Sequence, residues 1–349
     1  MIWEKKVASG RPTMQANPKE PVSFASGGDI PVGFPAKSPG SFSMDNLPLI
    51  GLRWRLEGSY NVSMSDSPEQ QMKCMEVWGG SQLTTRGVVF GGLDAWVYSK
   101  PHGQAQRGGD VYYASSCAAG RISRLLLADV SGHGTSVASI AADLRTLMRR
   151  FVNRWDQAEF VRLLNQQFSA LSKRGTFATA IVSTFFAPSR RLILCNAGHP
   201  RPILYRTSQQ EWSLLGQEGP TRLPGPLNLP LGIMGLTEYE HFDVELEPGD
   251  CVVTYTDALI ESSDADGEML GEEGVLRILK LLGDFKPEDL IDMLLGEIAE
   301  RYPENLADDD VTVLIVRANG RAQSFTLGDK MRAAGRMVGS ALRSLYTKG

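Results

Sequence analysis

Apolar positions between residues 85 and 317 fall mostly into short runs bounded by Gly, Pro, Asn, Asp or Ser. Such runs are typical of β-strands. A turn at 118–121 and a hairpin turn at 188–190 join neighbouring runs. The predicted strands cover residues 87–90, 95–98, 110–116, 122–130, 177–186, 191–196, 202–205, 242–246, 251–256 and 310–317.

A second pattern, apolar residues three and four positions apart, predicts four helices. They cover residues 137–151, 156–171, 271–282 and 287–301, with Pro287 near the start of the last one. Strands and helices come in runs and not in regular alternation. We therefore expect an α+β fold, a layered α/β/β/α sandwich of two antiparallel sheets flanked by helices.

The ends of the chain differ from this region. Residues 1–50 contain 7 Pro, 5 Gly and 6 Ser, which predicts a flexible leader. Residues 51–84 show no clear period and are expected to form an irregular entry to the domain at 85–317. Residues 318–349 form a basic tail, in which six Lys or Arg face one Asp. The tail is either a solvated terminal helix or a docking segment for an acidic partner or membrane surface, and Gly335 and Gly339 favour the first.

Bulk composition narrows the class of protein. Charged residues make up 22% of the chain and the net charge is −4, which gives no reason to expect a nucleic-acid partner. No apolar run approaches the roughly 18 residues of a membrane span, and the N-terminus lacks the apolar stretch of a signal peptide. The four cysteines form no C-x-x-C pair. Buried free thiols in a cytoplasmic protein are expected.

Four acidic segments hold the candidate chemistry. They are Gly108-Gly109-Asp110, Asp129 to Gly134, Thr256-Asp257 and Asp308 to Thr312, and each places an aspartate at a predicted strand end. Carboxylates gathered from distant strands suit hard divalent cations such as Mg²⁺ and Mn²⁺. Water on such ions can be directed at a phosphate, so the sequence predicts a metal-dependent phosphatase.

Each segment also has a simpler explanation. Asp129 and Asp257 could cap helices, Gly-Gly-Asp is a common turn, and three consecutive acids are usually solvated. The glycine turn after Asp129 could cradle a nucleotide phosphate, but it lacks the G-x-x-x-x-G-K-[ST] and G-x-G-x-x-G motifs. Taken together, four strand-end acids are harder to explain as caps.

The order and spacing of these segments, over about Gly87 to Arg317, resemble the metal-dependent protein phosphatase (PPM) superfamily. The resemblance is to its bacterial branch of stage II sporulation and sigma-factor-regulating phosphatases. It also rests on Phe177-Ala178-Thr179-Ala180, Asn196-Ala197-Gly198-His199-Pro200, Leu229-Pro230-Leu231-Gly232 and Pro248-Gly249-Asp250.

The resemblance implies a β-sandwich with two Mn²⁺ or Mg²⁺ ions at one end. Asp129 would bridge the ions, the carbonyl of Val130 would bind the first, and Asp257 and Asp309 would hold the second. Asp110 would bind directly or through water. Activated water would attack the phosphorus of phosphoserine or phosphothreonine, with no phosphoenzyme.

The resemblance further implies a bacterial enzyme acting on a phosphorylated regulator in a partner-switching pathway, such as an anti-sigma-factor antagonist. Ala258 stands where the family usually has glycine, and the family's usual entry helix is not recognisable before residue 85. These departures leave an alternative: a catalytically weak phosphatase-like module that binds a partner. They also suggest control by an activating partner.

Two histidines lie within the motifs. His133 and His199 could act as general acids, but Gly-His-Gly and Gly-His-Pro contexts favour packing or turn stabilisation. In the family branch, the helix that corresponds to residues 137–151 couples regulation to metal-site formation. That helix is therefore the candidate switch element.

Overall fold

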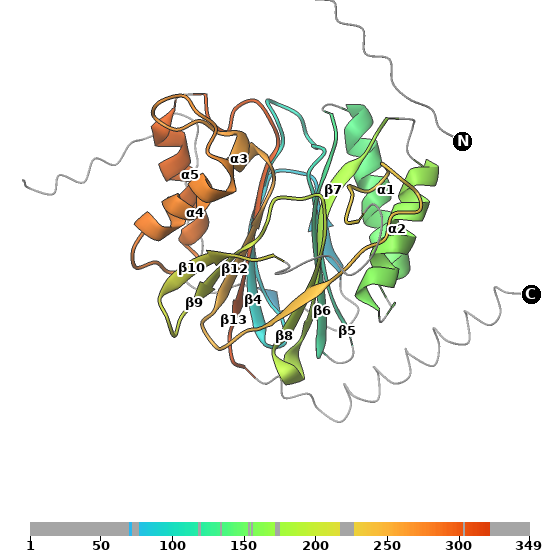
Figure 1. Cartoon of the computed structure of the whole chain (residues 1–349), viewed down its shortest axis with the longest axis horizontal. Coiled ribbons are helices and arrows are strands. Elements are labelled where there is room, and N and C mark those ends of the chain that lie inside the picture. Colours follow the sequence, from blue (N-terminus) through green and yellow to red (C-terminus); the bar gives the residue numbers. More distant parts are fainter. Residues whose placement is uncertain are drawn as a thin grey trace, which may run out of the picture. The chain divides into compact units, whose positions relative to one another are not determined.

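The computed structural model describes residues 70–71, 77–117, 120–132, 135–152, 154, 156–171, 175–216, 227–302 and 304–321. In this part of the chain, two β-sheets lie face to face and helices cover both outer faces (Figure 1). The predicted α+β fold of layered α/β/β/α form is confirmed. The expected leader at 1–50 and nearly all of the basic tail lie outside the described residues.

The first sheet has seven strands in the order β1-β3-β4-β13-β12-β9-β10. Its pairs are antiparallel except for β1 with β3. The strands are β1 (Gln70–Gln71), β3 (Thr84–Val89), β4 (Leu93–Lys100), β9 (Ile203–Arg206), β10 (Glu211–Leu214), β12 (Cys251–Tyr255) and β13 (Val311–Ala318).

The second sheet has six antiparallel strands in the order β11-β8-β7-β6-β5-β2. They are β2 (Val77–Gly80), β5 (Val111–Cys117), β6 (Ile122–Val130), β7 (Ala178–Phe186), β8 (Arg191–Ala197) and β11 (Phe242–Glu245). A short 3-10 turn, η1 (Ala187–Ser189), joins β7 to β8.

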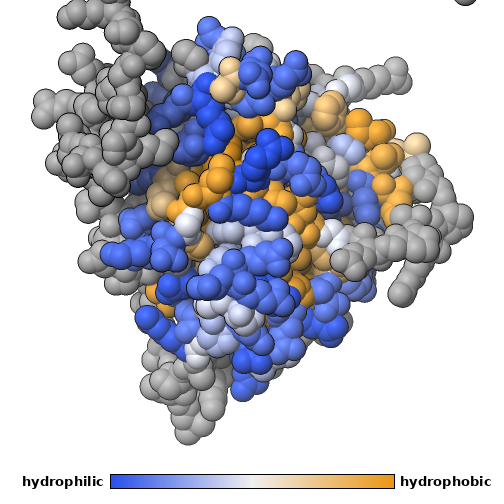
Figure 2. All heavy atoms as spheres, turned by 60° about the vertical axis from the view of Figure 1, so that its left-hand side comes forward, coloured by the Kyte–Doolittle hydropathy of each residue, from blue (hydrophilic) through white to orange (hydrophobic). Residues whose placement is uncertain are grey.

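Five α-helices complete the described part of the chain. The helices α1 (Thr135–Phe151) and α2 (Gln157–Leu171) cover the second sheet. The helices α3 (Ala258–Glu261), α4 (Gly271–Leu281) and α5 (Leu290–Arg301) cover the first. Figure 2 turns the α4–α5 side forward, and there hydrophilic residues cover most of the surface with hydrophobic residues between them. None of the described helices has the length and hydropathy of a membrane span.

Three apolar cores hold the layers together. In β6, Leu125 and Leu127 enter the core between the sheets, whereas Leu126 and Ala128 enter the core beneath α1 and α2. In β13, Leu314 faces the inter-sheet core and the residues on either side of it face the core beneath α3–α5. Since successive side chains of a strand point to opposite faces, a strand between two cores reads as a continuous apolar run.

Three short strands, β1, β2 and β10, were not predicted. The edge strand β2 lies in the segment expected to be irregular, where Gly79 approaches the backbone of Tyr112 so closely that a Cβ would meet its carbonyl oxygen at 2.5 Å. Because the close approach requires glycine, the strand lacks the alternation of apolar and polar side chains by which strands are recognised in a sequence. The strand β10 is a short hairpin partner of β9. The helix α5 begins at Leu290 and not near Pro287.

Candidate metal centre

Strand topology brings the four predicted acids to one end of the sandwich. In the second sheet, Asp110 directly precedes β5 and Asp129 lies near the end of β6, and these strands are antiparallel neighbours with Val111 opposite Ala128. In the first sheet, Asp257 follows β12 and Asp309 precedes β13, which are also antiparallel neighbours. Each sheet thus contributes two carboxylates to the same end.

The carboxyl group of Asp110 is the most deeply buried of the four, with 2% of the residue exposed. Its Oδ2 accepts a hydrogen bond from Thr256 Oγ1 at 2.9 Å, which links the two sheets. Its Oδ1 is buried and has no hydrogen-bond partner. Burial, followed by the charge of Asp129, raises the pKa of Asp110 well above its usual value. A buried carboxylate oxygen without a donor is the environment that a cation would complete.

Asp129 and Asp257 are partly buried and repel one another. Burial and then the charges of Asp257 and Asp309 raise the pKa of Asp129 to about 8. Burial and then the charges of Glu261 and Asp309 raise the pKa of Asp257 to about 6. Like charges that raise each other's pKa must lie close together in a poorly solvated site. The predicted residues Asp110, Asp129, Asp257 and Asp309 therefore form one acidic cluster.

Asp310 has a different task from its neighbour Asp309. Its carboxylate accepts backbone hydrogen bonds from His102 N–H at 2.6 Å, Gly109 N–H at 2.5 Å and Asp110 N–H at 3.3 Å. These bonds fix the loop that precedes β5. A Cβ on Gly108 would overlap the carboxylate of Asp310, so the loop requires glycine there.

The second glycine of the motif allows another close approach. A Cβ on Gly109 would lie 2.8 Å from the carbonyl oxygen of Val130, the predicted backbone ligand. Val130 N–H also donates to Gly109 O at 3.4 Å. Gly-Gly-Asp therefore does more than turn the chain: it brings the carbonyl of Val130 and the carboxyl of Asp110 to the same place.

Two buried threonines join the acidic cluster to the first sheet. Thr256 N–H donates to Thr312 O, and Thr312 N–H donates to Thr256 Oγ1, both at 3.0 Å. The hydroxyl of Thr312 lies 3.0 Å from that of Ser99. Because these groups are buried and mutually hydrogen-bonded, they hold the ends of β12 and β13 in a fixed register.

The helix-cap explanation of Asp257 is only partly met. Asp257 occupies the position before α3, but its side chain makes no capping hydrogen bond. Ala258 is the first residue of α3 and is not among the described residues with positive φ. The backbone here therefore does not require the family's usual glycine, and Ala258 gives no structural reason for a weakened second metal site.

Replacing Ala258 with glycine should therefore weaken the protein. Glycine loses more backbone entropy in a helix, so we expect the free energy of unfolding in urea to fall by about 1 kcal/mol. Gly296, inside α5 with open space around its Cβ position, is the matched control. Gly296→Ala should stabilise by a similar amount. A gain in stability from Ala258→Gly would show that the position needs glycine after all.

The donor set fits a hard divalent cation. It consists of carboxylate oxygens and one backbone carbonyl, and the orphaned Oδ1 of Asp110 lies among them. In the described part of the chain, no three His, Cys, Asp or Glu side chains are already arranged to hold a metal ion. The fold brings the acids to one end of the sandwich without placing three of their side chains around a common ion position.

His199 is a structural residue in this arrangement. Its ring Nδ1 lies 2.8 Å from Thr179 Oγ1, and its backbone N–H donates a hydrogen bond to Asn196 Oδ1 at 2.8 Å. Burial lowers its pKa to about 3, partly offset by the backbone of Tyr255. The ring is therefore neutral near pH 7, which supports the expected packing role over general-acid catalysis. His133 lies outside the described residues.

The predicted switch helix α1 is attached near its C-terminal end to a buried arginine. Arg124 on β6 donates from Nη2 to the carbonyl of Arg154, just beyond α1, and its guanidinium stacks on the ring of Phe160 at 4.9 Å. Burial lowers the pKa of Arg124. None of the ion pairs in the described residues involves it. Thus β6 holds Asp129 at one end and contacts the α1–α2 connection near the other.

Sequence reasoning missed two contributors. Asp310 could not be told from Asp308 and Asp309, because its role depends on a loop about 200 residues away. Glu261, at the end of α3, acts on both Asp129 and Asp257. Its position four residues after Asp257, one helical turn away, was a usable signal.

Solved structures show the same fold. The RsbU and RsbW domains of Rv1364c from Mycobacterium tuberculosis match with 20% identity over 82% of this chain and 72% of that one, at a TM-score of 0.51. The PP2C phosphatase domain with a regulatory fragment of SpoIIE from Bacillus subtilis matches with 19% identity over 70% and 64%, at 0.52. The SiaA-PP2C domain of Pseudomonas aeruginosa matches with 19% identity over 64% and 84%, also at 0.52.

Sequence comparison with curated proteins finds no match. A family model described as stage II sporulation protein E (SpoIIE) matches residues 120–319, which is more than half of the chain. The matched region contains Asp129, Asp257 and Asp309, whereas Asp110 lies before it. The resemblance drawn from the motifs is confirmed, and the chain belongs to the stage II sporulation protein E (SpoIIE) family.

Proposed function

We propose that the chain is a Mn²⁺- or Mg²⁺-dependent phosphatase of phosphoserine and phosphothreonine in proteins. One observation carries the proposal: Asp110, Asp129, Asp257 and Asp309 converge from both sheets, and burial and mutual repulsion raise the pKa of the first three. Such a cluster is unfavourable unless protons or cations neutralise it. The solved PP2C domains with the same fold support this reaction class.

The residues divide the work between binding and positioning. Asp129 and Asp257, with Asp110, Asp309 and the carbonyl of Val130, would hold two ions. When bound, such ions activate water for attack on phosphorus and neutralise charge on the phosphoryl oxygens. Thr256 orients Asp110 by donating to one of its oxygens, which leaves the other oxygen free.

The proposed substrate is a phosphorylated regulatory protein, such as an anti-sigma-factor antagonist. The Mycobacterium tuberculosis neighbour, which contains an RsbU and an RsbW domain, supports a partner-switching setting. A cytoplasmic location and an activating partner belong to the same proposal. Cys195 and Cys251 are buried free thiols, which fits a reducing compartment.

The test is hydrolysis of a small aryl phosphate by the full chain in EDTA, Mg²⁺ or Mn²⁺. We expect turnover with one or both ions and none in EDTA, because the acidic cluster alone repels a phosphate dianion. Zn²⁺ and Ca²⁺ serve as controls for ion preference. Absence of turnover with every ion, with and without candidate partner proteins, would contradict the proposal and favour the phosphatase-like binding module.

A further inference from the structure

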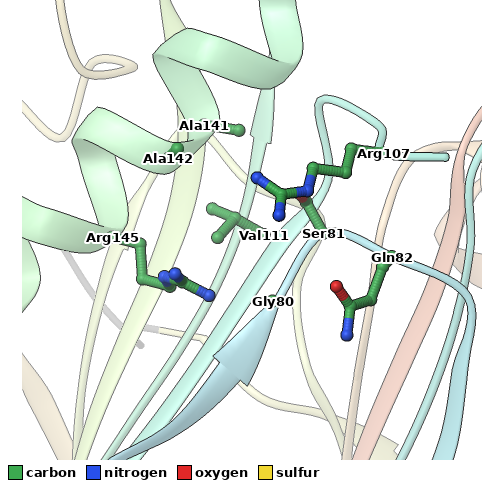
Figure 3. A pocket seen from close by; sticks show the side chains of 8 residues that line it. All are labelled: Gly80, Ser81, Gln82, Arg107, Val111, Ala141, Ala142 and Arg145. Carbon is green, nitrogen blue, oxygen red and sulfur yellow. The ribbon is translucent and has the colours of Figure 1, made fainter.

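A small pocket lies between α1 and the end of the edge strand β2, beside the start of β5, the strand that follows Asp110. Its volume is about 20 Å³, and its walls include Ser81, Gln82, Val111 and Ala141. Arg107, from the loop before β5, and Arg145, from α1, line it from two sides, and Figure 3 shows both guanidinium groups beside it. We refer to it as the Arg107–Arg145 pocket.

The arginines around this pocket have no acidic partner in the described residues. None of the ion pairs there involves Arg107 or Arg145. Arg145 donates one hydrogen bond to Gly79 O at 3.0 Å, which leaves its other N–H groups available.

This positive charge is separate from the acidic cluster. Among the described residues, no ion pair joins an arginine to Asp110 or Asp129. Arg107 is only three residues before Asp110, yet its side chain extends towards α1 (Figure 3). Its charge therefore remains available to a group from outside.

The pocket and the acidic cluster share one rigid loop. Gly108 N–H donates to Ser81 O at 2.8 Å beside the pocket, and the next residue, Gly109, donates to Asp310 beside the cluster. Three residues span at most roughly 11 Å. An extended peptide advances about 3.3 Å per residue, so a peptide held at the cluster would reach the pocket within about three residues of its phosphorylated position.

Size and charge identify the group that fits. A water needs about 10–15 Å³, so a pocket of about 20 Å³ has room for one end of a carboxylate. The planar fork of arginine matches carboxylate geometry. We propose that the Arg107–Arg145 pocket receives a glutamate or aspartate side chain of the phosphoprotein substrate, about three residues from the phosphoserine; this inference rests on the proposed phosphatase function.

The experiment compares two synthetic phosphoserine peptides. One carries glutamate at the positions three residues before and three residues after the phosphoserine, and the other carries glutamine at both positions. Values of kcat/KM are measured for the full chain, Arg107→Gln and Arg107→Lys. A charged hydrogen-bonded pair predicts about a tenfold preference of the unsubstituted protein for the glutamate peptide. Arg107→Gln should reduce this ratio to about one, and Arg107→Lys to about three, because lysine keeps the charge without the fork.

Arg277 on α4 is the matched control, since it is exposed and outside the ion pairs of the described residues. Arg277→Gln should leave the ratio at about ten and aryl phosphate hydrolysis unchanged. No preference in the unsubstituted protein, or an equal loss on both peptides in Arg107→Gln, would overturn the inference.

Failure of the phosphatase proposal would be seen separately, as absent hydrolysis of aryl phosphate by the unsubstituted protein. In that case the same two peptides are fluorescently labelled and their binding is measured by anisotropy in EDTA. The glutamate peptide should bind about tenfold more tightly, and Arg107→Gln should remove the difference. Equal binding of both peptides would overturn the pocket assignment.

Discussion

Asp129→Asn will abolish hydrolysis of an aryl phosphate and at the same time stabilise the metal-free protein. Loss of a residue that only supports a metal ligand costs up to roughly a hundredfold in activity. Because Asp129 is itself the proposed bridging ligand, its replacement should lower activity by more than that. Stability should rise because asparagine keeps the shape of aspartate without its charge. Activity is measured with Mn²⁺ or Mg²⁺, and stability by thermal unfolding in EDTA.

The raised pKa values of the acids predict the direction in which the stability of the metal-free protein changes with pH. The pKa of Asp129 is raised to about 8 and that of Asp257 to about 6, both above the value of roughly 3.9 in an unfolded chain. A group whose folded pKa is raised stabilises the fold most below its unfolded pKa, and that stability is lost as the pH rises through the folded pKa. In EDTA, the unsubstituted protein should therefore lose on the order of 3 kcal/mol between pH 5 and pH 8.

Asp129→Asn should lose less stability over the same pH range, and added Mn²⁺ should raise the Tm of the unsubstituted protein but not of the variant. Asp143, exposed on α1, provides the control, because Asp143→Asn should change neither activity nor the pH dependence. Full activity in Asp129→Asn would exclude Asp129 as a ligand. A metal-free stability that is flat from pH 5 to pH 8 would exclude the repulsion between the acids.

The second large effect is expected at Asp310, which binds no ion in the proposed centre. Asp310→Ala removes the acceptor of three backbone N–H groups in the loop before β5. Buried donors without acceptors are costly, so the free energy of unfolding should fall by about 3 kcal/mol or more. Displacement of Asp110 should also lower kcat/KM by about a hundredfold.

Its neighbours in the sequence are the natural comparison. Asp308→Ala, at an exposed position, should change stability by less than about 0.5 kcal/mol and leave activity intact. Asp309→Ala should remove activity without the loss of metal-free stability seen for Asp310→Ala, since it relieves repulsion on Asp129 and Asp257. The same stability loss at Asp309 and Asp310 would contradict the division of roles.

The acids of the site could be predicted because each follows or precedes a strongly apolar run. A carboxylate at the end of a buried strand stands out in sequence, as at Asp129 after residues 122–128. The layered fold could be predicted for the same reason, since strands with two buried faces, such as β6 and β13, leave a long apolar signal.

What remained hidden depends on contacts between distant segments. The strand β2 is marked by Gly79, whose value lies in a close approach to Tyr112 that only the folded chain reveals. Asp310 looks like any acid in a charge run until the loop at 102–110 folds against it. The Arg107–Arg145 pocket joins residues 38 positions apart, and neither arginine lies in a recognisable motif.

The three separate cores have a consequence for how the molecule opens. The core beneath α1 and α2 shares strands with the inter-sheet core but no side chains, because alternate residues of β6 and β7 face opposite ways. The α1–α2 layer can therefore detach at the cost of its own core, while the two sheets stay packed and hydrogen-bonded. Amide protons of this layer would then exchange with solvent before those of the two sheets. The α1–α2 layer and the sandwich would behave as two distinct units of local unfolding.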